Sequence, residues 1–127
     1  VGMEGSEINL NQYLDAVSER ELSGTKLNTF FDNYDLLLTP TLPITAFDAG
    51  TEVPTGSGMD RWTRWTPFSY PFNLGRHPAA SIPCGLCSNG LPAGLQIVGP
   101  MNCDGHVLAA SAAYEATNPI RMPSLED

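Results

Sequence analysis

Basic residues are scarce in this sequence. Six Lys and Arg stand against fourteen Asp and Glu, which gives a formal net charge of -8 at pH 7. Nucleic-acid binders carry basic patches and anionic membranes attract basic segments, so the charge balance argues against both partners. No apolar run is long enough for a transmembrane helix, and the first residues lack the pattern of a signal peptide. We therefore expect neither nucleic acid nor a membrane as a partner.

Cysteine is also scarce, and the count of three excludes a complete disulfide framework. This favours a reducing, cytoplasmic setting. The spacing C-x2-C-x15-C-x2-H, formed by Cys84, Cys87, Cys103 and His106, would nevertheless suit a structural zinc site. However, Cys84 lies in an apolar strand, where it and Cys87 would point to opposite faces if the strand continues to residue 87. Cys84 and Cys103 are more simply interpreted as small buried apolar side chains, and we expect no metal.

Motifs of several common enzyme classes are absent. There is no His-Glu-x-x-His, and no Gly-Lys-[Ser/Thr] follows the glycines of "GTEVPTGSG". Ser23 and Lys26 have the S-x-x-K spacing of serine β-lactamases, but Gly24 lies between them and no Lys-Thr-Gly is present. We interpret His77 and His106 as structural or solvated side chains. Short motifs alone therefore assign no chemistry to this chain.

The residues that are present predict alternating helices and strands. Hydrophobic residues make up 42% of the chain, which indicates a folded domain. Apolar residues recur at helical spacing over residues 9–31, and Asn9 with Gln12 resembles a capping box, although Gly24 could divide this helix in two. The run at residues 36–38, ended by Pro40, predicts a strand buried on both faces.

The second half predicts a hairpin and a final helix. Residues 42–64 form a long loop, and residues 65–73 contain two prolines and are no regular central strand. Asn89-Gly90 between two apolar runs predicts a β-hairpin. Asp104 is predicted to cap an Ala-rich helix, after which residues 117–127 form a loose tail.

Four segments in a fixed order carry a resemblance to a known family. They are "YDLLLTPTLP", "NLGRHPAASIPCG", "SNGLPAGLQIVGP" and "DGHVLAASAAYE". In this order they resemble the C-terminal part of the amidase signature family, from about residue 10 to about residue 116. The resemblance implies an α/β fold in which residues 1–116 are the C-terminal portion of an amidase domain, with part of a mixed β-sheet covered by helices. Cys87 and Cys103 are not part of the family pattern.

The chemistry that the resemblance implies is acyl transfer from an amide by a Ser-Ser-Lys mechanism, without metal or organic cofactor. The Gly-Gly-Ser-Ser-Gly signature and the catalytic lysine that precedes it in the family are absent from this sequence. Lys26, the only lysine, matches neither. We therefore expect a fragment of an amidase that hydrolyses nothing by itself.

The resemblance also implies substrate-binding residues. In the family, the segment equivalent to "WTPFSYPFN" lines the acyl pocket, so Trp65, Phe68, Ser69 and Tyr70 are candidates, suited to an apolar or aromatic acyl group of a small amide. Asp104 matches an acidic position that meets a substrate amino group in the amidotransferase branch. The alternatives are that the aromatic residues only pack the core and that Asp104 only caps its helix.

Two interpretations of the whole chain stay open. As an amidase fragment it should expose an apolar surface, and it could form a homodimer through that surface. Alternatively, it is a self-standing small α/β binding domain without catalysis.

Overall fold

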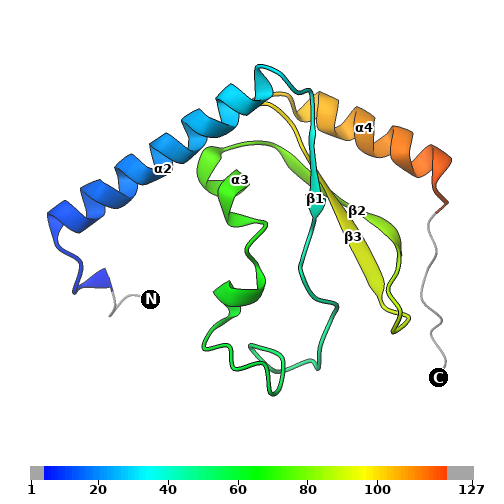
Figure 1. Ribbon diagram of the computed structural model, residues 1–127, viewed down its shortest axis with the longest axis horizontal. Coiled ribbons are helices and arrows are strands. Elements are labelled where there is room, and N and C mark those ends of the chain that lie inside the picture. Colours follow the sequence, from blue (N-terminus) through cyan, green and yellow to red (C-terminus); the bar gives the residue numbers. More distant parts are fainter. Residues whose placement is uncertain (1–4, 120–127) are drawn as a thin grey trace.

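The computed structural model of the protein describes residues 5–119, which form an α/β arrangement (Figure 1). Its elements in chain order are α2 (Leu10–Phe31), β1 (Leu37–Pro40), the 3-10 helix η1 (Trp62–Trp65), α3 (Tyr70–Gly75), β2 (Ala79–Leu86), β3 (Pro92–Val98) and α4 (Asp104–Thr117). The predicted helix, hairpin and final helix are therefore confirmed. The region from residue 65 to 73 is helical turns and loop, as its prolines predict.

The strands form one three-stranded sheet in the order β1-β3-β2, and both pairings are antiparallel. The β2–β3 hairpin turns at Asn89-Gly90. Gly90 has a φ of 80° and its N–H donates to the Cys87 carbonyl, while the Asn89 side chain accepts from the Leu91 N–H. A left-handed residue is needed at this point, and glycine adopts that conformation without a steric penalty.

A β-bulge interrupts β2 between Pro83 and Gly85. Cys84 is the extra residue of this bulge, and its side chain is exposed. The expectation that Cys84 is buried is therefore wrong, because an unpaired bulge residue loses the alternation that would direct it into the core. Cys103 is half-buried.

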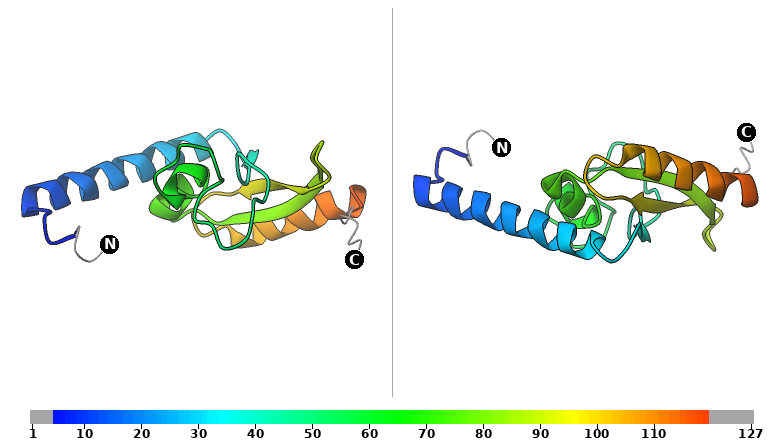
Figure 2. Two further views of the ribbon diagram at one scale, coloured as in Figure 1. Left: turned by 90° about the horizontal axis from the view of Figure 1, so that it is seen from below. Right: turned by 90° about the horizontal axis from the view of Figure 1, so that it is seen from above.

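The two faces of the sheet have different neighbours. Ile97 of β3 packs with Ile82 of β2 and Val107 of α4, so α4 covers one face (Figure 2). Gln96 precedes Ile97 and therefore points to the opposite face, where it bonds to the backbone of Phe68. Few apolar side chains are fully enclosed in this arrangement: Phe72, Ile82, Ile97, Val98 and Val107.

The first strand is less buried than the sequence predicts. The prediction of burial on both faces is wrong, because half-buried and exposed residues alternate along β1 and Leu38 remains 58% exposed. Leu38 pairs with Ile97 and lies on the face that α4 covers, but α4 packs mainly on β2 and β3, so Leu38 is left uncovered.

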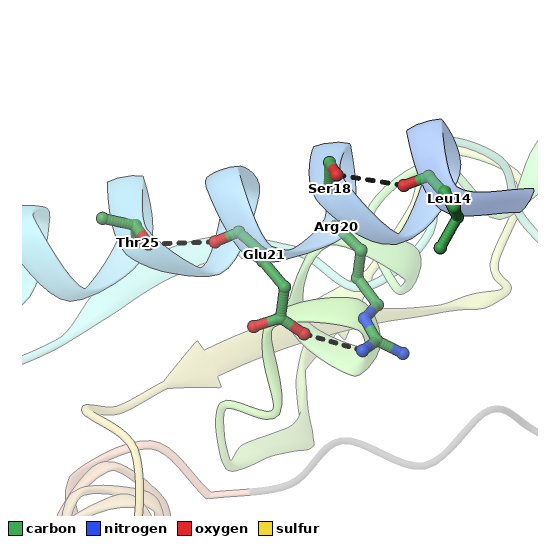
Figure 3. A network of polar contacts seen from close by, with 5 residues as sticks. All are labelled: Leu14, Ser18, Arg20, Glu21 and Thr25. Carbon is green, nitrogen blue, oxygen red and sulfur yellow. Dashed lines mark hydrogen bonds and ion pairs between the residues drawn. The ribbon is translucent and has the colours of Figure 1, made fainter. Parts of the chain in front are cut away.

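The long helix α2 begins at a complete capping box. Asn9 accepts from the Gln12 N–H at 3.0 Å, and Gln12 Oε1 accepts from the Asn9 N–H at 2.9 Å. Farther along, the hydroxyls of Ser18 and Thr25 donate to carbonyls one turn earlier, and Arg20 pairs with Glu21 at 2.6 Å (Figure 3). These bonds give the polar side chains partners within the helix.

Gly24 does not divide α2, contrary to the predicted break. It lies where α2 crosses α3, and a Cβ built at Gly24 would be 3.7 Å from Gly75 Cα. The helix therefore continues through Gly24, where α2 packs against the backbone of Gly75. Next to this crossing, buried His77 stacks on Phe31 with ring centroids 5.3 Å apart. Its Nε2 donates to Asn28 Oδ1 at 3.1 Å.

The predicted cap of α4 is wrong by one residue. Cys103 occupies the N-cap position, and Asp104 is the first helical residue without a side-chain capping bond. Its carboxylate lies in the first turn, where a negative charge is favoured by the helix dipole. α4 ends at Thr117, so the predicted tail begins about where the helix stops, and residues 120–127 lie outside the described part.

Between residues 5 and 119, no helix is both long and apolar enough to cross a membrane.

Candidate functional site

An apolar groove of about 980 Å³ lies between the sheet, the chain that follows β1 and Trp65. It is lined by residues 38–47, Trp65, residues 81–84, Cys87 and residues 92–95. None of these residues is charged, so the groove suits an uncharged and largely apolar ligand group.

Trp65 is fixed in the wall of this groove by two neighbours. Its indole N–H donates to the Glu52 carbonyl at 2.9 Å, and its ring meets Phe47 edge to face with centroids 5.4 Å apart. The Glu52 carboxylate also accepts from the Trp62 N–H at 3.2 Å. The long loop therefore folds back onto η1 and holds the indole in one orientation.

The polar part of the groove is a pair of hydroxyls. Thr41 Oγ1 and Ser81 Oγ are 2.7 Å apart, and the Thr41 N–H donates to the Gly94 carbonyl at 2.9 Å. A Cβ at position 94 would lie 2.7 Å from Thr41 Oγ1, so glycine is needed for this close approach. At the other end of the loop, Asn89 donates to Thr45 Oγ1 at 3.0 Å, which ties residues 41–47 to the hairpin turn.

The structure brings only one of the five predicted binding residues into this groove. Trp65 lines it, whereas Phe68, Ser69 and Tyr70 do not. Phe68 is half-buried and its carbonyl accepts from Gln96. Ser69 precedes α3 without a side-chain cap bond. Tyr70 opens α3 with its ring 6.0 Å from Trp62, and its hydroxyl is buried without a hydrogen-bond partner.

Asp104 is exposed in the first turn of α4 and does not line the groove. Cys103 holds the N-cap position and Asp104 follows it as the first helical residue, so its exposed carboxylate is accessible to another group.

The cysteines do not assemble into a metal site. Cys84 and Cys87 both line the groove. Their expected orientation to opposite faces required the strand to continue to residue 87, and this condition is not met, because β2 ends at Leu86 and is bulged at Cys84. Cys103 precedes α4 and is not in the groove. Over residues 5–119, no three side chains of His, Cys, Asp or Glu are grouped closely enough to hold a metal ion.

Several groove residues were not identified from the sequence. Thr41 and Ser81 lie in segments that carry the family resemblance but were not singled out as binding residues, and Phe47 lies in the long loop. A usable signal was the repeated Thr-Pro pattern of "LTPTLP", since prolines after a strand direct the chain away from the sheet and hydroxyls between them remain available.

The groove contains one serine, Ser81. In the described part of the chain, the Ser81 hydroxyl is hydrogen-bonded to Thr41 and to no lysine, histidine or carboxylate. Lys26 is exposed on α2, away from the groove lining. A serine hydroxyl without an adjacent base is a weak nucleophile at neutral pH, so the geometry of this hydroxyl pair favours a binding role.

Known proteins contain segments similar to this chain in sequence. The family model described as Amidase matches residues 3–108. Among curated proteins, a glutamyl-tRNA(Gln) amidotransferase subunit of Brevibacillus brevis is 42% identical over 105 residues, which cover 83% of this chain and 21% of that protein. The corresponding subunit of Thermosynechococcus vestitus is 37% identical, covering 84% of this chain and 22% of that protein.

Solved structures agree with the sequence relatives. A bacterial aryl acylamidase of the amidase signature family superposes with a TM-score of 0.75 at 36% identity, covering 91% of this chain and 25% of that one. The glutamyl-tRNA(Gln) amidotransferase subunit of Thermotoga maritima superposes with a TM-score of 0.73 at 30% identity, covering 91% and 26%. The chain thus spans about a fifth of the length of these curated relatives and about a quarter of the solved ones.

Proposed function

Because the chain belongs to the Amidase family, we propose that it is the C-terminal part of a longer amidase that hydrolyses small amides and that it forms one wall of the substrate cleft. In this proposal the Ser-Ser-Lys residues lie in the preceding part, and this chain alone is inactive. The observation that carries the proposal is the match of residues 3–108 to the family, combined with coverage of only about a fifth of the relatives.

The exposed surface supports a missing counterpart. The accessible surface is 9260 Å², whereas a folded monomer of this mass, 13.7 kDa, typically exposes about 6,600 Å². Large apolar side chains contribute to the excess, including Leu10, Tyr13, Leu14, Leu22 and Leu38. This number of exposed large apolar side chains indicates that another protein surface covers them. We assign this role to the preceding part of the same protein.

The groove supports the substrate class. Its lining is uncharged, and Trp65 with Phe47 gives it an aromatic wall. We therefore assign to it the acyl side of an amide with an apolar or aromatic acyl group. Phe68, Ser69 and Tyr70 remain candidates in this proposal, on the segment that carries Trp65. Asp104 remains a candidate for a cationic or amino group of the substrate, because its carboxylate is not used in capping.

The test compares this chain with the longer protein that the proposal requires, expressed from the source coding sequence. Both are purified and assayed for release of amine from acetyl, butyryl, benzoyl and phenylacetyl anilides. We expect the longer protein to be active and to be inactivated by substitution of the lysine of the Ser-Ser-Lys set. We expect this chain alone to show no release above the blank.

Two results would contradict the proposal. Amide hydrolysis by the isolated chain would show that the reaction needs no upstream residues. A start codon directly before Val1, together with a monodisperse and inactive chain, would instead support a self-standing binding domain.

A further inference from the structure

We propose that Gln96 is a positioning residue that joins two segments contributing to the groove lining and thereby sets the groove's preference for the size of the acyl group; the second half of this proposal depends on the proposed function. Gln96 lies on the central strand and is 6% exposed. Its side-chain Nε2 donates to Thr39 Oγ1 at 2.9 Å and to the Phe68 carbonyl at 3.0 Å.

The acceptors identify the orientation of this amide. A backbone carbonyl only accepts, so the group that faces Phe68 must be the NH2 and not the oxygen of the glutamine. Thr39 in turn donates its hydroxyl proton to the Pro40 carbonyl at 3.1 Å, which leaves its oxygen free to accept from Gln96. Both protons of one buried amide are therefore used in bonds to two separate segments.

Both segments contribute to the lining of the groove. Thr39 belongs to β1 and itself lines the groove, as do the residues that follow β1. Phe68 follows Trp65 by three residues on the aromatic segment of residues 62–72, and Trp65 also lines the groove. β1 lies at the edge of the sheet, and the aromatic segment is not part of the sheet. The Gln96 amide therefore adds a hydrogen bond to each of two segments that have few other backbone partners.

Removing the amide protons should therefore release the aromatic segment. Gln96→Met keeps a long unbranched side chain and removes both bonds, which leaves the Phe68 carbonyl unpaired. Thr39→Val removes only the bond to β1. The matched control is Ser111→Ala, because Ser111 is also a buried polar residue, at 8% exposed, but bonds only within α4 through the Val107 carbonyl at 2.8 Å.

The chain provides its own reporter for this experiment. Its two tryptophans, Trp62 and Trp65, both lie in η1 of the aromatic segment. For Gln96→Met we expect a red shift of tryptophan emission and stronger quenching by acrylamide, while the far-ultraviolet circular dichroism keeps its helix and strand content. We expect a smaller change for Thr39→Val and none for Ser111→Ala.

A folded Gln96→Met protein with unchanged emission and quenching would overturn the proposal, and so would an equal change in Ser111→Ala. If Gln96→Met does not fold, the unaltered chain decides the question by nuclear magnetic resonance. The two Nε2 protons of Gln96 should then exchange slowly with solvent and show contacts to Thr39 and Phe68. Rapid exchange would reject the two bonds.

The preference for acyl size is measured in the longer protein with the anilide series. Gln96→Met should raise KM more for benzoyl and phenylacetyl anilides than for acetyl anilide, with kcat for acetyl anilide less affected. An equal change in KM for all acyl groups would reject the role in preference. If the longer protein has no amidase activity, the proposed function fails while the tryptophan result still tests the anchor.

Discussion

His77 precedes β2 and contacts Asn28 and Phe31 of α2, so it connects this helix to the sheet. It is 6% exposed, and burial lowers the pKa of its imidazole below the ordinary value of 6.5, opposed in part by a backbone interaction with Gly75. Nδ1 is buried without a hydrogen-bond partner among the described residues, and Nε2 donates to Asn28. The neutral ring is therefore the form that the folded chain favours.

The consequence is a pH dependence of stability. The unfolded chain binds a proton at His77 below about pH 6.5, whereas the folded chain resists it, so the free energy of unfolding falls as pH decreases through 6.5. The decrease ends once the pH is below the folded-state pKa. Urea denaturation between about pH 7 and pH 5 should show this loss, and His77→Gln should reduce its slope. An unchanged slope in His77→Gln would assign the dependence to other groups.

Two further residues show what a local pattern cannot specify. Asp104 has the chemistry of a helix cap, but α4 starts one residue earlier and Cys103 takes that position. Cys84 lies in an apolar strand, but the bulge at Pro83 and Gly85 turns it outwards. In both cases a shift of one residue decides the environment of the side chain. For Cys84 in β2, such a shift also changes the face of the sheet to which the side chain points.

At the scale of elements, α2 is attached mainly through its crossing with α3. The two glycines at this crossing differ in how much space they leave for a side chain. A Cβ at Gly75 would lie 2.8 Å from His77 Nδ1 and 3.0 Å from Leu27 Cδ1, whereas a Cβ at Gly24 would meet only the backbone of Gly75, at 3.7 Å and beyond. The first contact is a clash and the second is ordinary packing.

This difference predicts opposite effects of two matched substitutions. Gly75→Ala should lower the free energy of unfolding by about 1–3 kcal/mol and loosen α2. Gly24→Ala should be neutral or raise it by up to about 1 kcal/mol, because alanine favours the helix. Urea denaturation and hydrogen exchange of the α2 amides measure both. Equal destabilisation by the two variants would show that α2 and α3 do not cross as described.

At the scale of the whole molecule, exposed apolar surface is the dominant feature. The apolar positions at the start of α2 continue the helical spacing of the residues that pack on α3, yet Leu10, Tyr13 and Leu14 are 70%, 60% and 49% exposed. The open edge of β1 adds unpaired backbone groups. Both surfaces favour association when no other part of a protein covers them.

We therefore expect the isolated chain to self-associate. Light scattering coupled to size exclusion should show a mass that rises from monomer towards dimer with concentration. The double substitution Leu10→Glu and Leu14→Glu should shift this equilibrium towards monomer, because it places charges on the apolar face of α2. Glu7→Gln, which alters an exposed charge preceding α2, is the control. A strictly monomeric wild-type chain at all concentrations would contradict this expectation.

The sequence by itself determined the local elements and the family. The capping box at Asn9, the Asn89-Gly90 turn and the helical spacing of α2 depend on residues close in the chain, so short-range chemistry is sufficient to predict them. The ordered segments from "YDLLLTPTLP" to "DGHVLAASAAYE" were enough to identify the family.

Only the tertiary structure decided which residues meet. The groove joins Thr41 to Ser81 and Trp65, which are 40 and 24 residues from it along the chain, and no local pattern encodes those contacts. Gly24 predicts a helix break until its neighbour Gly75 is known. Likewise, the role of Gln96 depends on Thr39 and Phe68, at separations of 57 and 28 residues. The formation of a helix or turn depends on residues that are close in the sequence. A binding site depends on which distant segments the fold brings together.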